Sequence, residues 1–344
     1  MQHHQFAWVA LLFAAQTLAQ TTTSCNPTLK TCPADAGLSS TTYTHDFTQG
    51  ADDANWNMTA SGVTYTSSGA EFTITKSGDA PTLQSKWHIL FGRVSFHMRS
   101  AAGTGIVSSA ILQSSDLDEV DWEWLGGNTK QVQTNYFGKG NTTSYDRAVW
   151  SPVTDPQTVT RNYTILWTSS ATTWYIDGTL IRTLAYADAL GGKNYPQTPM
   201  NVRIGSWSGG DPANDEGTIE WSGGETNYND APFTMYLEKV EVVNDTPASS
   251  YTYGDMSGSY ESIEVDGKDG ATDTKSSSGS SSSATPTSTA SQTPSGSVTG
   301  AAMAASASAK IVQAQASGGQ GRGVPGWTKA VLGSWIVCNL SWMI

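Results

Sequence analysis

Residues 116–126 read DLDEVDWEWLG, and this stretch decides the fold class. Its acidic and apolar residues alternate, so on an extended strand of period two they separate onto opposite faces. One face carries Glu119, Asp121 and Glu123, and the other carries Val120, Trp122 and Trp124. The sequence therefore predicts a strand with a packed core behind it and a row of carboxyls in front.

Like charges lined up on one strand face repel each other, and their burial is costly unless the arrangement is used. Glycoside chemistry needs two carboxyls, roughly 5–5.5 Å apart for retention of configuration and about 6.5–9.5 Å apart for inversion. The Cα atoms of Glu119 and Glu123 lie about 13 Å apart on an ideal strand, and twist and side-chain lean close most of this gap. Asp121 can hydrogen-bond to one Glu and help to separate the two pKa values.

Two other interpretations of the acidic row remain open from the pattern alone. The row can be a solvated outer strand, or it can belong to a calcium site. The apolar face argues against the first, because Trp122 and Trp124 need a core behind them. Val120 argues against the second, because it stands where an Asp-x-Asp-x-Asp-Gly loop needs its third acid.

Residues 119–123, together with the following Trp-Leu-Gly, resemble the Glu-x-Asp-x-Glu signature of glycoside hydrolase family 16. The resemblance is strongest to the fungal Crh branch, the chitin-to-glucan cross-linking transglycosylases. It implies that Glu119 is the nucleophile, that Asp121 assists it and that Glu123 is the general acid/base. It spans roughly residues 40–243.

The composition agrees with a β protein that acts on neutral carbohydrate. The 344 residues include 13 Trp and 13 Tyr, and the net charge of −12 leaves no basic surface for nucleic acid. Short alternating or apolar runs predict strands, and the Asp177-Gly178 pair predicts a hairpin turn within residues 173–182. The other predicted strands cover residues 71–75, 92–99, 105–112, 132–137, 163–167, 200–205 and 234–242. We expect an all-β, two-sheet antiparallel sandwich, a concanavalin-like jelly roll.

Several residues outside the acidic row are candidates for binding sugar. Gln133 and Asn135 alternate in the same sense as the acids, and the family resemblance implies that such a strand lines the sugar groove; solvent-facing polar residues are the equal alternative. Trp207 and Trp221 lie in Gly-rich segments, where an exposed ring can stack on sugar, with core packing as the alternative. Trp167 and Trp174 are expected to be structural. The sequence does not rank the remaining candidates, Lys139, Tyr145, Arg147 and Trp150.

The N-terminus predicts export. Residues 1–19 resemble a signal peptide, although His3 and His4 stand where Lys or Arg is usual. In an oxidising compartment Cys25 and Cys32 are expected to pair. The sequons that begin at Asn57, Asn141, Asn162 and Asn244 are candidate N-glycosylation sites.

The expected organisation is a catalytic domain over residues 20–265, with the Cys25–Cys32 loop and a C-terminal extension, followed by a Ser/Thr-rich stalk over residues 266–316. Residues 317–344 resemble a glycosylphosphatidylinositol anchor signal with attachment at Ser317 or Gly318. The mature protein is then expected on the outer face of the plasma membrane, within reach of the cell wall.

The resulting hypothesis is a monomeric, retaining cell-wall transglycosylase without cofactor or metal. The resemblance implies cleavage of chitin oligomers and transfer to β-glucan or chitin. One alternative is an endo-β-glucanase or chitinase-type hydrolase of the same family. The other is a carbohydrate-binding sandwich that has lost catalysis; the presence of both Glu119 and Glu123 argues against it.

Overall fold

The structure, a computed structural model, describes residues 23–144 and 146–267. The expected signal peptide, anchor signal and nearly all of the expected stalk lie outside these residues. Cys25 and Cys32 form the expected disulfide. Within the described part of the chain no helix has the length and apolar character needed to cross a membrane.

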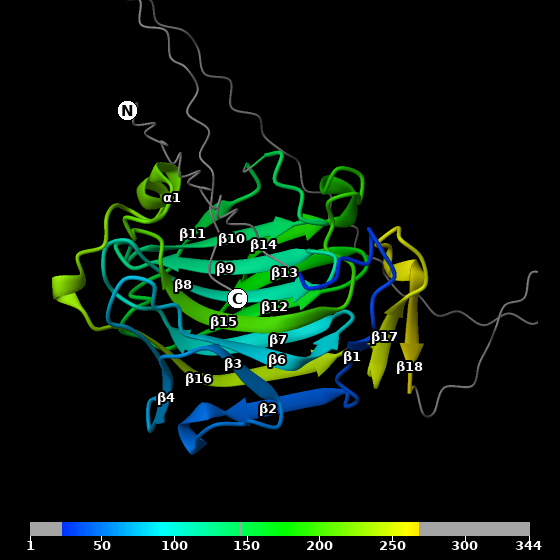
Figure 1. Ribbon diagram of the computed structural model, residues 1–344, viewed down its shortest axis with the longest axis horizontal. Helices are drawn as coiled ribbons and strands as arrows, with labels where there is room; N and C mark the ends of the chain where they lie inside the picture. The colour runs from blue at the N-terminus through cyan, green and yellow to red at the C-terminus, as the bar shows by residue number, and fades with distance from the viewer. Residues whose placement is uncertain (1–22, 145, 268–344) are drawn as a thin grey trace, which may run out of the picture. The chain divides into compact units, whose positions relative to one another are not determined.

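Two large antiparallel sheets carry the fold (Figure 1). The seven-stranded sheet has the order β11 (Val149–Pro152), β10 (Gln131–Phe137), β9 (Glu119–Leu125), β8 (Ile106–Ser114), β15 (Met200–Ser208), β6 (Thr82–Ile89) and β3 (Trp56–Ala60). The eight-stranded sheet has the order β14 (Thr179–Ala185), β13 (Ala171–Ile176), β12 (Arg161–Trp167), β7 (Gly92–Arg99), β16 (Phe233–Asn244), β5 (Gly69–Ile74) and β4 (Val63–Thr66), and β2 (Thr42–Asp46) also pairs with β16. This is the two-sheet jelly roll that the strand pattern predicts.

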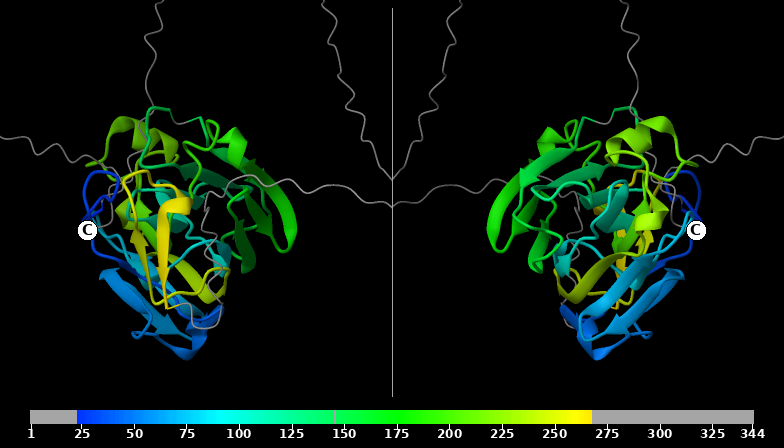
Figure 2. Two further views of the ribbon diagram at one scale, coloured as in Figure 1. Left: turned by 90° about the vertical axis from the view of Figure 1, so that its right-hand side faces the viewer. Right: turned by 90° about the vertical axis from the view of Figure 1, so that its left-hand side faces the viewer.

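A small third sheet joins the two ends of the described chain. It consists of β1 (Asp35–Ala36), β17 (Ser250–Tyr253) and β18 (Ile263–Asp266). The left view of Figure 2 turns the right-hand side of Figure 1 toward the viewer and shows β17 and β18 in yellow in front of the two main layers. The remaining elements are short: α1 (Glu216–Trp221) and the 3₁₀ turns η1 (Phe47–Gln49), η2 (Tyr186–Asp188), η3 (Tyr228–Asp230) and η4 (Tyr260–Ser262).

Aromatic residues fill the space between the two main sheets. Trp122 and Trp124 on β9 are stacked, with ring centroids 6.0 Å apart, and both contact Tyr163 on β12 in a T-shaped arrangement. All three side chains are almost completely buried. Each such side chain removes a large apolar area from water, so the apolar half of the 119–125 alternation fixes which face of β9 turns inward.

The strand predictions hold where alternation or turn chemistry is strong. The strand predicted over residues 92–99 matches β7, and β13 and β14 form the predicted hairpin. Asp177 and Gly178 both have positive φ, 49° and 79°, as a type I′ turn requires. The strands not predicted from the sequence are β1, β2, β3, β4, β6, β11, β17 and β18.

Candidate active site

The three acids lie together on the face of β9 that points away from the second sheet. We call this side of the seven-stranded sheet the acidic face. Glu119, Asp121 and Glu123 are only 2%, 1% and 2% exposed. They are therefore not a solvated outer row, and that alternative is wrong. Buried carboxyls need either compensation or protonation, so their immediate partners decide what they can do.

Strand pairing places polar residues on both sides of each acid. Residues opposite each other in an antiparallel pair share a face, so the register of β8, β9 and β10 gives the neighbours directly. Gln133 lies opposite Glu123, and Asn135 lies opposite Asp121. Both are buried on the acidic face. The pairing condition attached to these two candidates is thus met, while their contact with sugar stays a prediction.

Glu119 has partners that favour its charged form. The amide Nε2 of Gln113, which lies opposite it on β8, donates to Glu119 Oε2 at 2.7 Å. Arg203 on β15 is close enough to interact electrostatically with Glu119; burial lowers the pKa of Arg203 to about 10, and the Glu119 charge opposes that shift. A hydrogen-bond donor and a nearby cation both stabilise a carboxylate. Glu119 is therefore suited to act as an anionic nucleophile.

The surroundings of Glu123 favour its protonated form instead. Burial, and secondly the charge of Glu119, raise the pKa of Glu123 to about 8. Its Oε1 is buried and has no hydrogen-bond partner among the described residues. A carboxyl with this pKa is mostly protonated at neutral pH, so it can donate a proton to a leaving oxygen.

Asp121 lies between the two glutamates in sequence. Burial, the charges of Glu119 and Glu123, and a hydrogen bond with Glu119 raise the pKa of Asp121 well above its usual value. A protonated Asp121 can donate that hydrogen bond to the Glu119 carboxylate. The row thus separates into Glu119, whose partners stabilise a negative charge, and Glu123, whose raised pKa favours the protonated form, which is the division of labour that a retaining glycosidase needs.

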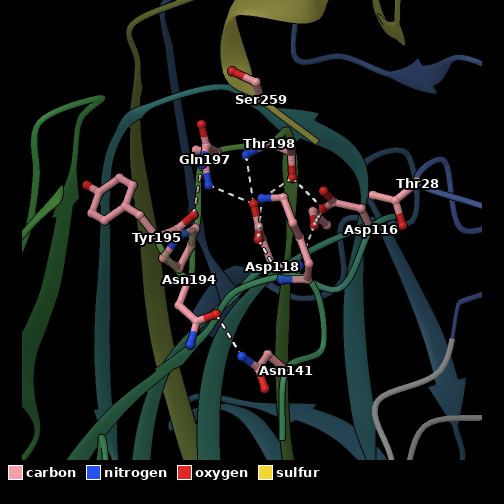
Figure 3. A network of polar contacts seen from close by, with 12 residues as sticks. Thr28, Asp116, Asp118, Asn141, Asn194, Tyr195, Gln197, Thr198 and Ser259 are labelled. Carbon is pink, nitrogen blue, oxygen red and sulfur yellow. Dashed lines mark hydrogen bonds and ion pairs between the residues drawn. The ribbon is translucent and has the colours of Figure 1, made fainter. Parts of the chain in front are cut away.

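A second buried network holds the start of β9 (Figure 3). The carboxylate of Asp118 accepts hydrogen bonds from the backbone N–H groups of Gln197, Thr198 and Lys139 at 2.7, 3.1 and 2.9 Å. The Thr198 hydroxyl bonds to both Asp118 and Asp116. Lys139 Nζ forms an ion pair with Asp118 at 3.6 Å. The residue before Glu119 is therefore tied to the turn after β10 and to the segment that leads into β15.

Trp207 differs from its expected exposure. It is 3% exposed and packs with Val107 and Leu125 on the acidic face, because Trp221, at the end of α1, covers it. The two indoles are stacked, with centroids 6.2 Å apart. Trp221 is partly exposed, so it is the ring of this pair that solvent reaches. Trp167 and Trp174 are fully buried, as expected for structural residues.

The structure distinguishes among the four candidates that the sequence did not rank, Lys139, Tyr145, Arg147 and Trp150. Lys139 forms an ion pair with Asp118, and the Arg147 guanidinium donates to the backbone carbonyls of Asn141 and Ser144. Tyr145 lies outside the described residues. Trp150 alone among the described candidates is exposed on the acidic face, opposite Gln133.

The structure contradicts the prediction that Asn244 is a glycosylation site. Its side chain is 3% exposed, and its Nδ2 donates to the carbonyl of Leu38 at 2.8 Å and to that of Ser40 at 3.3 Å. An amide nitrogen buried in this way has no room for a glycan. Asn57, in contrast, is exposed. Asn141 and Asn162 are partly buried.

Gln113 and Arg203 were missed from the sequence. Both reach Glu119 only through strand pairing, and the predicted strand over residues 105–112 stopped just before Gln113. The alternation of residues 106–114 could have included Gln113, but nothing local indicates which strand lies beside β9.

In the described ranges no group of three or more His, Cys, Asp or Glu is arranged to hold a metal ion.

Comparison with known proteins agrees with this geometry. The family model for glycosyl hydrolases family 16 matches residues 50–223. Crh-like protein 1 of Aspergillus fumigatus is 57% identical over 251 residues, which cover 73% of this chain and 68% of that protein. Crh-like protein 5 of the same fungus is 55% identical, covering 72% of this chain and 63% of its own length.

A solved structure is similar over the same region. The Crh5 transglycosylase in complex with NAG superimposes with a TM-score of 0.69 at 55% identity, covering 70% of this chain and all of that one. The similarity therefore extends over a complete solved domain that contains the acidic strand.

Proposed function

The chain belongs to glycosyl hydrolase family 16, and from that premise we propose that it is a cell-wall transglycosylase that acts by retaining double displacement. The observation that carries the proposal is the buried acid row, in which Glu119 has partners for a negative charge and Glu123 holds a proton. The similarity to Crh-like proteins and to the Crh5 transglycosylase supports transfer as the outcome.

In the first step Glu119 attacks the anomeric carbon of the donor glycan. The bond from that carbon to the glycosidic oxygen breaks, and the Glu123 proton passes to the leaving oxygen. A covalent glycosyl-enzyme on Glu119 results. Asp121 can donate a hydrogen bond to Glu119 before attack and again when its carboxylate is released.

In the second step Glu123, now a carboxylate, removes a proton from an acceptor hydroxyl. The acceptor oxygen bonds to the anomeric carbon, Glu119 leaves, and the starting protonation states return. A sugar hydroxyl as acceptor gives transglycosylation, whereas water gives hydrolysis. Gln133, Asn135 and Trp221 are the proposed sugar contacts, and Trp207 supports the Trp221 ring that covers it.

We propose chitin oligomers as donors and β-glucan or chitin as acceptors. The NAG in the relative's complex supports an N-acetylated sugar among the substrates. The test is incubation of the purified protein with chitin oligomers and a fluorescent β-glucan acceptor. A hybrid product that carries the label supports transfer, and reducing ends without hybrid would mean a hydrolase. Glycan binding without any turnover would mean a carbohydrate-binding sandwich.

The proposed setting is the outer face of the plasma membrane, through a lipid anchor at Ser317 or Gly318. The small residues at 317–319, the polar spacer and the apolar tail support this proposal. Phospholipase C specific for phosphatidylinositol should release the protein from intact cells. A mature protein whose mass includes residues 320–344 would contradict the anchor.

A further inference from the structure

Trp150 occupies a specific position relative to the acid/base residue. It lies on β11, the edge strand of the seven-stranded sheet, directly opposite Gln133 on β10. Gln133 in turn lies directly opposite Glu123 on β9. Opposite residues in antiparallel pairs share a face, so Trp150, Gln133 and Glu123 form one row across the acidic face. Two strand spacings separate the ends of this row, about 10 Å between Cα atoms.

The indole of Trp150 is available to a ligand. Its side chain is 36% exposed, although large aromatic residues are usually covered. Within residues 23–144 and 146–267 it makes no hydrogen bond and no ring–ring contact. A single exposed apolar residue is ordinary on a protein surface. The feature that distinguishes Trp150 is its place in the row that begins at Glu123.

The backbone under Trp150 is held from the other side of the sheet. Arg182 on β14 donates through Nη1 to the carbonyl of Thr134 and through Nη2 to the carbonyl of Arg147, both at 2.7 Å. The Thr134 hydroxyl donates to the carbonyl of Val149 at 3.3 Å. The Arg182 guanidinium itself lies over the buried ring of Trp174, 4.7 Å from its centroid. These contacts fix the edge strand, so the exposed ring has a defined position. A ligand that stacks on the ring therefore costs little conformational entropy of the protein.

We propose that Trp150 is a sugar-stacking residue, and that a pyranose unit of a β-linked glycan lying along the Glu123–Gln133–Trp150 row packs its CH face on the indole. The inference rests on the proposed function, because it takes Glu123 as the point where the glycosidic oxygen lies. A flat ring with an apolar face suits the axial CH groups of a β-linked pyranose, and the edge position leaves room for the chain to continue beyond the sheet. The glycan on the ring is either donor or acceptor, and the experiment distinguishes these sources.

The test compares Trp150→Ala, Trp150→Phe and Val149→Ala in the full-length protein. Val149 is the matched control, because it is an exposed apolar residue on the same strand whose side chain points to the opposite face. The KM for chitin oligomers is measured at saturating acceptor, and the KM for fluorescent β-glucan at saturating donor. Trp150→Ala should raise one of these two KM values about tenfold with a smaller change in kcat. Trp150→Phe should recover most of this loss, and Val149→Ala should behave like wild type.

The variant results assign or overturn the role. A raised donor KM places the donor on Trp150, and a raised acceptor KM places the acceptor there. Unchanged KM values in Trp150→Ala, or an equal rise in Val149→Ala, would overturn the inference. Near-ultraviolet circular dichroism and the melting temperature check that each variant is folded. If the alanine variant unfolds, Trp150→Gln takes its place, because glutamine also removes the flat ring, and it should show the same rise in KM.

The wild-type protein separates this inference from the proposed function. If wild type makes no hybrid product but releases reducing ends, transfer fails as a function, and the donor arm still tests Trp150. If wild type makes hybrid product and Trp150→Ala matches it in both KM values, the stacking role alone fails.

Discussion

The indole Nε1 of Trp174 donates a hydrogen bond to the backbone carbonyl of Asp121 at 3.2 Å. Trp174 lies on β13 of the eight-stranded sheet, and Asp121 is the middle acid of β9 on the other sheet. The bond crosses the core and fixes the catalytic strand from behind. The acid row is therefore positioned by a buried residue that never meets the substrate.

Replacing Trp174 by Phe should lower both stability and turnover. The variant keeps an aromatic ring but leaves the Asp121 carbonyl without this donor and a small cavity beside it, so we expect a loss of about 1–3 kcal/mol in unfolding free energy. Because the acids shift without losing their chemistry, kcat should fall more than KM rises. Denaturant unfolding and steady-state kinetics measure both effects.

Trp167→Phe is the matched control for this prediction. Trp167 is equally buried, and its Nε1 donates to the carbonyl of Pro196 instead of to β9. Trp167→Phe should lower the unfolding free energy by a similar amount with little change in kcat. An equal fall in kcat for both variants would show that general destabilisation, and not the bond to Asp121, slows turnover.

Glu119→Gln and Glu123→Gln should fail at different steps. Both variants should lose about 10³-fold or more in turnover of unactivated chitin oligomers, because each removes one of the two carboxyl functions. A donor with an aryl leaving group needs no proton, so Glu123→Gln should still form the glycosyl-enzyme from it, whereas Glu119→Gln should not. Mass spectrometry of the intact protein detects that intermediate. An adduct in Glu119→Gln would mean that the roles are wrongly assigned.

The raised pKa of Glu123 predicts how activity depends on pH. The first step needs protonated Glu123, so kcat/KM for the donor should fall as the pH rises through about 8. With the aryl donor, whose departure needs no proton, this alkaline fall should be much weaker when glycosyl-enzyme formation is followed. A profile in which both donors fall together would place the titrating group elsewhere.

The same pKa predicts how stability depends on pH. The folded-state pKa of Glu123 is about 8 against a usual value of 4.5, so the folded protein holds a proton that the unfolded chain releases. This contribution to stability is fully present below about pH 4.5 and is lost as the pH rises to about 8. Glu123→Gln cannot ionise, so its melting temperature should exceed that of wild type by several degrees at pH 8 and by less at pH 4.5. No difference between these pH values would contradict the prediction.

Asp118→Asn should destabilise the start of β9. It removes the negative partner of Lys139, whose Nζ is buried without a hydrogen-bond partner in the described part of the chain, so we expect a loss of about 1–3 kcal/mol. The double variant Asp118→Asn/Lys139→Met should recover part of this loss, because no unpaired cation remains. Denaturant unfolding of the single and double variants measures this coupling. Strict additivity of the two changes would mean that the ion pair contributes nothing.

Local patterns in the chain are enough to specify the fold class and the chemistry of one strand. Alternation over residues 119–124 specifies both an apolar face and an acidic face, because side chains of a strand point alternately to opposite sides. The Asp177-Gly178 turn is equally local, since few residues adopt two successive positive φ angles. Strands β2, β3, β4 and β6 were not predicted, although β3 (WNMTA), β4 (VTYT) and β6 (TLQSKWHI) place apolar residues at nearly every second position, so the local signal for them was present.

Tertiary structure decided everything that depends on which strands are neighbours. Gln113 and Arg203 reach Glu119 because β8 pairs with β9 and β15 pairs with β8. Trp150 joins the row of Glu123 because β10 pairs with β9 and β11 pairs with β10. The protonation states follow from burial between these strands, which no local pattern contains. The predicted exposure of Trp207 and of the Asn244 sequon was wrong because Trp221 covers Trp207 and because the carbonyls of Leu38 and Ser40, far away in the chain, hold the Asn244 side chain. Sequence determines which residues share a strand face, whereas long-range packing determines what lies beside that face and whether water reaches it.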